Sequence, residues 1–454
     1  MHRDLSAIFK AYDVRGTYPD EIDEDAARRI GAALARFCDA SRLAVGRDMR
    51  TSSEALARAF ARGASSVGAE VLDLGLVSTD GLYFASGKLD VPACMVTASH
   101  NPGRYNGFKP CRAGAAPIGS ESGLKDIQAL AEKGEAVAEV SDGRDSDLGE
   151  QLDIIGDYSA HCRSFVEVDA LKPLKVVVDA GNGMAGLTVP VVFADLPFQL
   201  VPLYFELDGT FPNHPASPIE PENLVDLQRA VQETGSDLGI AFDGDADRMF
   251  LVDERSNLVS GSTTTALVAE RVLKKQPGER IIYNLICSWT VPEVIKENGG
   301  EPIRTRVGHS FIKDVMATTG AAFGGEHSGH YYFRDNFRAD SGMIAALLVL
   351  EALSLAGKPL SELLEPYYRY SASGEINSEV EDQQERLEAL AAGYQQGKQD
   401  RTDGLTIEFE DWWFNCRPSN TEPLLRLNLE ARTEELMKTK RDEVLSLIRD
   451  NREG

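Results

Sequence analysis

The 454-residue sequence lacks closely spaced cysteines and long apolar runs. Its six cysteines are scattered without a C-x-x-C pair, which argues against a disulfide framework or a zinc site. No apolar stretch approaches the roughly 18 residues that a membrane-spanning helix needs. The first residues, MHRDLSAIFKAYDVRG, contain no apolar core of a secretory signal. We therefore expect a cytoplasmic protein without a membrane partner.

Basic residues are also scarce, with 47 Lys and Arg against 72 Asp and Glu and a net charge of −25. General nucleic-acid binding needs a basic excess that neutralises phosphates, so we expect no nucleic-acid partner. An anionic small substrate is compatible with this composition if a few Arg and Lys converge locally. Walker and G-x-G-x-x-G phosphate loops are absent, and DAGNGMAG (179–186) has the wrong spacing, so we interpret it as a tight turn.

Strand-like and helix-like segments alternate along most of the chain, which predicts several α/β units. Examples are strands at 42–48, 70–75 and 238–242 and helices at 52–68 and 339–356. The last part differs, because a Glu/Gln/Ala-rich helix is followed by antiparallel-type alternation and a charged helix. We predict three similar mixed α/β domains and a smaller C-terminal α+β domain, with boundaries at 1–145, 146–253, 254–370 and 371–454.

The stretch TASHNP (97–102) follows an apolar run and contains a candidate nucleophile, Ser99. Strand ends that open into loops are where α/β proteins place reactive groups. A serine hydroxyl needs a base or a metal to become a good nucleophile. The alternative interpretation is a polar turn in which Ser99 and Asn101 bond nearby backbone before Pro102. This stretch alone does not decide between them.

The stretch FDGDADR (242–248) places three carboxylates, Asp243, Asp245 and Asp247, after an apolar strand. Converging carboxylates repel one another unless a cation lies between them, and hard oxygen ligands suit Mg²⁺. An EF-hand is excluded, because Arg248 occupies the position that requires glycine. A solvated acidic turn remains the alternative. Arg248 adds a positive charge, as a site that handles phosphoryl oxygens would need.

Two further loops carry polar side chains in suggestive patterns. GGEHSGH (324–330) alternates Glu326, Ser328 and His330, a set able to bind sugar hydroxyls, although a simple hairpin turn would fit as well. RPSNTEP (417–423) offers Arg417 and several hydroxyl and amide donors for a phosphate, with a polar β-turn as the alternative. His309, in RVGHS (306–310), precedes a predicted helix.

Together and in this order, these loops resemble the α-D-phosphohexomutase superfamily, most closely its bacterial phosphomannomutase/phosphoglucomutase branch. FKAYDVRG (9–16) and NGFKP (106–110) complete the ordered set, and the resemblance covers essentially the whole chain. It implies four domains around a central active-site cleft, each contributing one loop. It also makes a nucleophilic Ser99 much the better of the two interpretations of TASHNP.

The resemblance further implies a role for each matching position. Ser99 would carry the phosphoryl group, and Mg²⁺ would be held by Asp243, Asp245, Asp247 and a phosphoserine oxygen. The groups around the transferring phosphoryl would be Arg15, Lys109, Arg248, Tyr12 and His100. Sugar hydroxyls would meet Glu326 and Ser328, with His309 and His330 lining the cleft. The distal phosphate would be held by Arg417, Ser419, Asn420 and Thr421. Either Lys109 or His330 would be the general acid/base.

We therefore expect an isomerase that interconverts mannose 6-phosphate and mannose 1-phosphate, with glucose phosphates as second substrates and a hexose 1,6-bisphosphate as intermediate and activator. His327 stands where the glucosamine branch often has Gln, which favours the mannose/glucose branch. We expect a monomer or homodimer. The alternatives are a haloacid-dehalogenase-type phosphatase or mutase with Asp243 as nucleophile, and a non-catalytic sugar-phosphate-binding protein.

Overall fold

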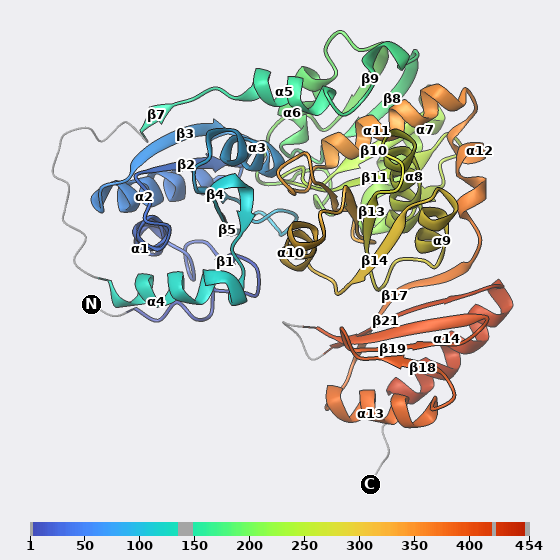
Figure 1. The fold of residues 1–454 in the computed structure, drawn as a ribbon. Coiled ribbons are helices and arrows are strands. Elements are labelled where there is room, and N and C mark those ends of the chain that lie inside the picture. The colour runs from blue at the N-terminus through green and yellow to red at the C-terminus, as the bar shows by residue number, and fades with distance from the viewer. Residues whose placement is uncertain (1–2, 135–148, 420–423, 450–454) are drawn as a thin grey trace.

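The computed structural model describes residues 3–134, 149–419 and 424–449, and these residues form four β-sheets in succession along the chain (Figure 1). Helices accompany every sheet, and the fourth sheet is the most separate part of the molecule in Figure 1. We call the parts built on these sheets domains I to IV. The predicted fold class, three mixed α/β domains followed by an α+β domain, is confirmed.

Domain I contains a mixed sheet. Its strand order is β1 (Val14–Thr17), β5 (Tyr105–Arg112), β4 (Ala93–Val96), β2 (Arg42–Arg47), β3 (Glu70–Leu76) and β7 (Glu150–Gln151), with β6 (Ala116–Pro117) on β5. Its helices are α1 (Glu24–Phe37), α2 (Ser53–Ser66), α3 (Thr79–Leu89) and α4 (Lys125–Lys133). Helices α1 and α2 touch through glycines, because a Cβ on Gly31 would lie 2.1 Å from the Phe60 carbonyl oxygen. A larger residue there would push the two helices apart.

Domains II and III each place helices around a smaller sheet. The order in domain II is β12 (Leu258–Val259), β11 (Met249–Asp253), β10 (Leu238–Phe242), β8 (Leu174–Asp179) and β9 (Phe198–Leu203), with α5 (Ile155–Arg163), α6 (Ala185–Val192) and α7 (Val225–Thr234). The order in domain III is β14 (Glu301–Thr305), β13 (Arg280–Asn284), β15 (Phe323–Gly325) and β16 (Tyr331–Phe333), with α8 (Gly261–Lys275), α9 (Thr290–Glu297), α10 (His309–Thr319), α11 (Gly342–Ala356) and α12 (Leu360–Leu364).

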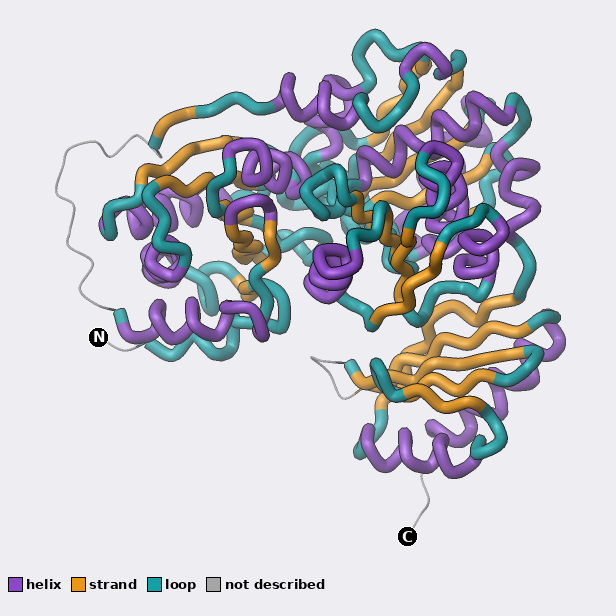
Figure 2. The backbone as a smooth tube through the Cα atoms, in the orientation of Figure 1, coloured by secondary structure: helices purple, strands orange, loops and turns teal. Residues whose placement is uncertain are grey.

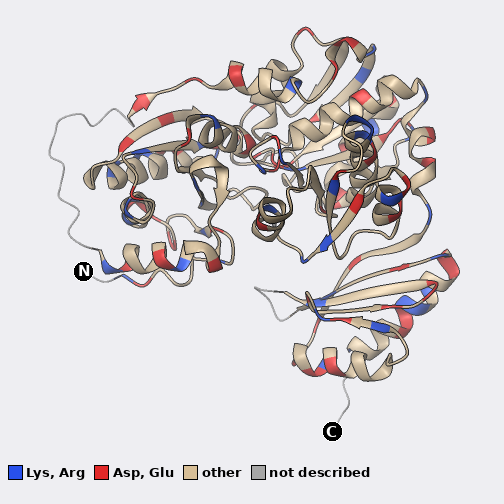
Figure 3. Ribbon diagram, in the orientation of Figure 1, with Lys and Arg blue, Asp and Glu red and all other residues tan. Residues whose placement is uncertain are grey.

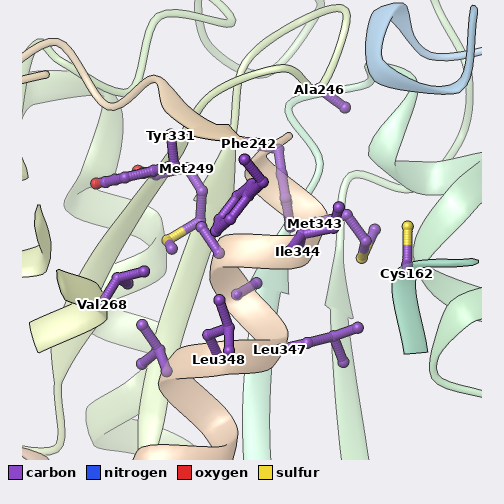
Figure 4. Close-up of a cluster of buried hydrophobic side chains, with 14 of the residues drawn as sticks. Cys162, Phe242, Ala246, Met249, Val268, Tyr331, Met343, Ile344, Leu347 and Leu348 are labelled. Atoms are coloured by element: carbon purple, nitrogen blue, oxygen red, sulfur yellow. The ribbon is translucent and has the colours of Figure 1, made fainter. Parts of the chain in front are cut away.

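Helix α11 joins domains II and III into one core. It packs against α8 of domain III and against α5 and β11 of domain II, so apolar side chains on nearly all its faces are buried. Figure 4 shows Met343, Ile344 and Leu348 of α11 beside Phe242 and Met249 of the domain II sheet. Within the described residues, no single helix has the length and apolarity to cross a bilayer. The helix pair Gly342–Ala356 and Leu360–Tyr367 reaches that length and apolarity only when the two are taken together, and it is bent by 97°.

Domain IV is an antiparallel sheet with both of its helices on one face (Figure 2). The strand order is β17 (Ser371–Glu379), β21 (Leu424–Ala431), β20 (Trp412–Pro418), β19 (Leu405–Glu408) and β18 (Lys398–Asp400), and the helices are α13 (Gln383–Gly393) and α14 (Glu434–Arg449). Asp and Glu residues are spread over all four domains (Figure 3).

Two short strands lie beyond the predicted domain boundaries. Strand β7 pairs with β3 of domain I, although the predicted first domain ends at residue 145. Strand β12 pairs with β11 of domain II, although the predicted second domain ends at residue 253. Each strand is two residues long, too short for its alternation to be recognised from sequence.

Candidate active site

The TASHNP stretch leaves the domain I sheet where β4 ends at Val96. Ser99 is 4% exposed and has a left-handed backbone with φ 50°. Its Oγ donates to Asp243 Oδ2 at 2.8 Å and lies 3.2 Å from His100 Nδ1. The loop is therefore a tight polar turn, and the same turn aims the Ser99 hydroxyl at the acidic loop of domain II.

The three aspartates of FDGDADR follow β10 and are buried together. Asp243, Asp245 and Asp247 each offer a carboxylate oxygen within 4.8 Å of the others. Lys109, on β5, donates from Nζ to Asp245 Oδ2 at 2.7 Å and to Asp247 Oδ2 at 2.8 Å. Arg248 Nε donates to Asp243 Oδ2 at 2.9 Å. Three negative charges thus face two positive ones.

The donor set fits a hard divalent cation. Asp245 Oδ1 and Asp247 Oδ1 are buried and have no hydrogen-bond partner. A buried carboxylate oxygen without a donor is unfavourable, so this arrangement leaves two oxygens whose charge a cation would satisfy. Carboxylate oxygens in a group of three are ligands that suit Mg²⁺. Asp243, Asp245 and Asp247 could therefore hold such an ion.

Burial and neighbouring charges shift the pKa values around the trio. Burial raises the pKa of Asp243 to about 6, although the Arg248 charge opposes this rise. For Asp245, burial also acts to raise the pKa, but the Lys109 ammonium outweighs it and lowers the pKa below its usual range. The positive charge of Arg248, together with burial, lowers the pKa of His100 well below its ordinary value. The imidazole of His100 is therefore neutral beside Ser99.

A cavity of about 210 Å³ lies in front of these groups. Eight residues predicted from the sequence line it: Tyr12, Arg15, Ser99, His100, Lys109, Asp247, Arg248 and His330. Arg15, on β1, reaches the cavity while its Nη1 donates to Asn101 Oδ1 at 2.6 Å. Asp13, Tyr83 and Asp340 also line the cavity and were not predicted. Residues far apart in the chain thus meet at one place.

His330 reaches the cavity from the hairpin between β15 and β16. An isolated antiparallel bridge pairs His330 with Arg248, which brings domain III against the acidic loop. His330 Nδ1 lies 3.0 Å from Asp340 Oδ2, and Asp340 Oδ1 pairs with the buried Lys313 Nζ at 2.7 Å. Sequence reasoning missed Asp340 because it placed this residue inside the apolar helix, whereas α11 begins at Gly342.

The other predicted sugar-loop residues lie differently. Glu326 is 2% exposed, and its carboxylate accepts hydrogen bonds from the Tyr332 hydroxyl at 2.7 Å and from Gly308 N at 3.2 Å. Ser328 is half-buried, and neither residue is among the described residues that line the cavity. His309 begins α10. The predicted contacts of Glu326 and Ser328 with sugar hydroxyls stay predictions.

The predicted phosphate loop begins at the end of β20 in domain IV. Arg417 Nη2 donates to Glu375 Oε2 at 2.7 Å, while its buried Nε has no hydrogen-bond partner. Burial raises the pKa of Tyr12, and the positive charge of Arg306 opposes that rise. Ser419 N donates to the Leu424 carbonyl at 2.8 Å. The predicted ligands Asn420 and Thr421 lie outside the described residues.

Family models match consecutive parts of the chain. The alpha/beta/alpha domains I, II and III of "Phosphoglucomutase/phosphomannomutase" match residues 6–138, 156–257 and 260–370, and its C-terminal domain matches residues 375–447. A phosphomannomutase of Salmonella montevideo is 42% identical over 97% of this chain and 98% of its own length. A protein of Xanthomonas campestris named "Phosphohexose mutases" is also 42% identical, over 97% of this chain and 99% of its own length.

Solved structures agree. A phosphoglucomutase/phosphomannomutase family protein from Burkholderia thailandensis superposes with a TM-score of 0.87 at 31% identity, covering 99% of both chains. The four family models together span most of the sequence, in the order in which the four sheets follow one another. The chain therefore belongs to the phosphoglucomutase/phosphomannomutase family and is a phosphohexomutase, an enzyme of the isomerase class.

Proposed function

We propose that this phosphohexomutase interconverts mannose 6-phosphate and mannose 1-phosphate and also accepts glucose phosphates. The observation that carries the proposal is the hydrogen bond from the Ser99 hydroxyl to the buried Asp243, with Ser99 lining a cavity together with Lys109 and Arg248. Relatives of similar length are named phosphomannomutase, which supports mannose phosphates as substrates. Glucose and mannose differ only at C2, so a site that holds phosphates separates them poorly.

Phosphorylated Ser99 transfers its group to the free hydroxyl of a hexose monophosphate. The Oγ–P bond breaks while a new P–O bond forms, the attacking hydroxyl loses its proton and the leaving Ser99 Oγ gains one. The products are a hexose 1,6-bisphosphate and unmodified Ser99. Phosphoryl transfer depends mainly on in-line positioning and on neutralising the equatorial oxygens. Arg15, Lys109 and Arg248 supply positive charge around that group. When bound by Asp243, Asp245 and Asp247, Mg²⁺ would add further positive charge at the phosphoryl oxygens.

We assign His330 rather than Lys109 as the group that takes the proton of the attacking hydroxyl. Lys109 Nζ is held by two carboxylates, those of Asp245 and Asp247, which favour its charged form. His330 lines the cavity, and its Nδ1 is hydrogen-bonded to Asp340. That bond leaves Nε2 as the ring atom that exchanges a proton with the substrate.

The second half-reaction needs the bisphosphate to turn around, so that its other phosphate reaches Ser99. The phosphate that is not reacting must then be held at a distance from Ser99 in both orientations. Arg417 supports this role, because its guanidinium Nε is buried without a hydrogen-bond partner. A guanidinium with unused donors suits a phosphate ligand.

The test is the substitution Ser99→Ala, assayed with mannose 1-phosphate, Mg²⁺ and catalytic hexose 1,6-bisphosphate. We expect turnover to fall by several orders of magnitude while circular dichroism stays unchanged, since Ser99 lies on a loop. Intact-mass spectrometry with peptide mapping should find one phosphate on Ser99 of the wild type and none on the variant. Near-normal turnover in Ser99→Ala would refute the proposal.

The phosphorylated wild-type protein also distinguishes this proposal from the haloacid-dehalogenase alternative. An acyl phosphate on Asp243 would be cleaved by hydroxylamine, whereas phosphoserine would survive. Both Asp243 oxygens accept hydrogen bonds, from Ser99 Oγ, Arg248 Nε and Arg248 N, which disfavours Asp243 as the attacking group. A hydroxylamine-labile phosphate would reverse this assignment.

A further inference from the structure

Arg50 lies outside the cavity and binds the backbone of the loop that contains Ser99. It belongs to the turn between β2 and α2, and its side chain is fully buried together with that of Asp48. A buried arginine is rare unless its charge and all its donors are satisfied. The hydrogen-bond partners of the guanidinium therefore indicate what Arg50 does in this part of the protein.

Every donor of the Arg50 guanidinium has a partner, and four of the five partners are carbonyls of one loop. Nη2 donates to Ser99 O at 2.8 Å and to Asn101 O at 2.6 Å. Nη1 donates to Pro102 O at 2.9 Å and to Tyr105 O at 2.9 Å. Nε donates to Asp48 Oδ2 at 3.1 Å. The five N–H groups of one arginine are thus used in full, which a lysine with three donors could not reproduce.

The same network holds the backbone N–H of Ser99. Thr97 Oγ1 accepts from Ser99 N at 2.9 Å and donates to Asp48 Oδ2 at 2.7 Å. Arg50 therefore binds the carbonyl of Ser99 directly, and its partner Asp48 binds the amide of Ser99 through Thr97. Ser99 needs such support because its φ of 50° lies in the left-handed region that non-glycine residues disfavour.

The opposite side of the loop is closed by domain II. A Cβ on Gly244 would lie 2.4 Å from the Ser99 carbonyl oxygen, so the acidic loop packs directly on the Ser99 backbone. A Cβ on Gly209 would lie 2.4 Å from the Arg50 Cα, so domain II also packs on the arginine turn. The position of the Ser99 hydroxyl relative to Asp243 is thus fixed by the fit between Arg50 and the loop.

We propose that Arg50 is a positioning residue for phosphoryl transfer. Its guanidinium holds the backbone of residues 97–105 in place and so orients Ser99 Oγ without contacting the substrate. This inference rests on the proposed role of Ser99. Displacements of about 1 Å in a reacting group can lower rates about 100-fold. Loosening the loop should therefore lower the rate of transfer and leave substrate affinity nearly unchanged.

The test is Arg50→Lys, assayed for kcat and KM with mannose 1-phosphate, Mg²⁺ and hexose 1,6-bisphosphate. We expect kcat to fall about 100-fold while KM changes less than about threefold. The matched control is Arg163→Lys. Arg163 also holds backbone carbonyls, of Val191 and Val192, but lies on α5 away from the cavity. Arg163→Lys should leave kcat within about threefold of the wild type.

A second variant keeps the proposal testable if Arg50→Lys does not fold. Thr97→Val preserves the shape of the side chain but removes the acceptor for Ser99 N and the donor to Asp48, so kcat should fall at constant KM. A wild-type kcat in either folded variant would overturn the proposal, as would equal losses in Arg50→Lys and Arg163→Lys. An active Ser99→Ala would instead refute the proposed function, so the two failures are distinguishable.

Discussion

Asp80 is a buried carboxylate at the junction of three domains, and it allows a quantitative prediction about stability. It lies in the first turn of α3 and is 1% exposed. Its Oδ2 accepts hydrogen bonds from the Tyr158 hydroxyl of α5 at 2.6 Å and from the Ser341 hydroxyl before α11 at 2.7 Å. Burial raises the pKa of Asp80 from 3.8 to about 6, against the effect of these donors.

The sign and size of the effect follow from linkage. The folded pKa lies above the unfolded value, so the folded state binds the proton more tightly. The resulting stabilisation is complete below pH 3.8 and is lost as the pH rises through about 6. A shift of about two pKa units corresponds to about 3 kcal/mol of unfolding free energy. Ionised Asp80 therefore weakens the junction at neutral pH relative to acidic pH.

The perturbation is Asp80→Asn, because asparagine has nearly the same side-chain shape as aspartate and cannot ionise. Urea unfolding of both proteins at a series of pH values from about 4 to about 7.5 gives the difference in unfolding free energy, wild type minus variant. We expect this difference to fall by about 2.5 kcal/mol across the series, because the series starts at about pH 4, where the stabilisation is not yet complete. The aspartates of the acidic loop titrate in both proteins, so their own contributions cancel, apart from the repulsion between Asp247 and Asp80, which is part of the Asp80 shift. A difference independent of pH would refute the reasoning.

Tyr158→Phe provides the matched control for this titration. The phenol donor favours the charged form of Asp80, so its removal should raise the pKa of Asp80 further. The Tyr158→Phe variant, which keeps Asp80, should then lose its acid stabilisation at a higher pH than the wild type. A movement in the opposite direction would show that burial and hydrogen bonding have been assigned the wrong balance.

Two further predictions concern the ligands. Arg417→Ala should raise KM for mannose 1-phosphate about 10- to 100-fold with a smaller change in kcat, because a charged hydrogen bond to phosphate is worth about 1.5–3 kcal/mol; an unchanged KM would count against Arg417 as a phosphate ligand. Chelation with EDTA should abolish turnover and added Mg²⁺ should restore it, with Asp245→Asn needing more Mg²⁺ for half-maximal activity. Full turnover in EDTA would exclude the proposed metal site.

Sequence periodicity predicted the elements that surround the site. Strands at 42–48, 70–75 and 238–242 appear as β2, β3 and β10 within a residue or so at each end. They are buried apolar runs bounded by polar turns, so local pattern is enough to find them. The loops that follow strand ends also contain the proposed nucleophile and a proposed metal ligand, Ser99 after β4 and Asp243 after β10.

The remaining features depend on contacts that local pattern does not encode. Arg50 and Ser99 are 49 residues apart, and Arg50 looks like an ordinary polar residue before a helix. Asp340 lies at the edge of the apolar helix, and the local pattern does not show whether the helix begins before or after it. The burial of Glu326 was missed for the same reason, because its partners Tyr332 and Asn284 come from separate strands. Which buried polar groups meet is a property of the tertiary packing.

The contacts between domains divide the site into a fixed half and a separately held half. Domains I and II are locked at the nucleophile, since Thr79 Oγ1 donates to Asp245 Oδ2 at 2.6 Å and Gly244 packs on the Ser99 backbone. Arg417 belongs to domain IV, which is joined to domain III by hydrogen bonds such as that from Trp289 N to Glu430 Oε2 at 2.9 Å. Ser99 and the acidic loop therefore form one unit. Under the proposed mechanism, we expect adjustment to the two orientations of the bisphosphate to occur on the Arg417 side. Substitutions at the domain III–IV contacts should accordingly change KM, whereas substitutions between domains I and II should change kcat.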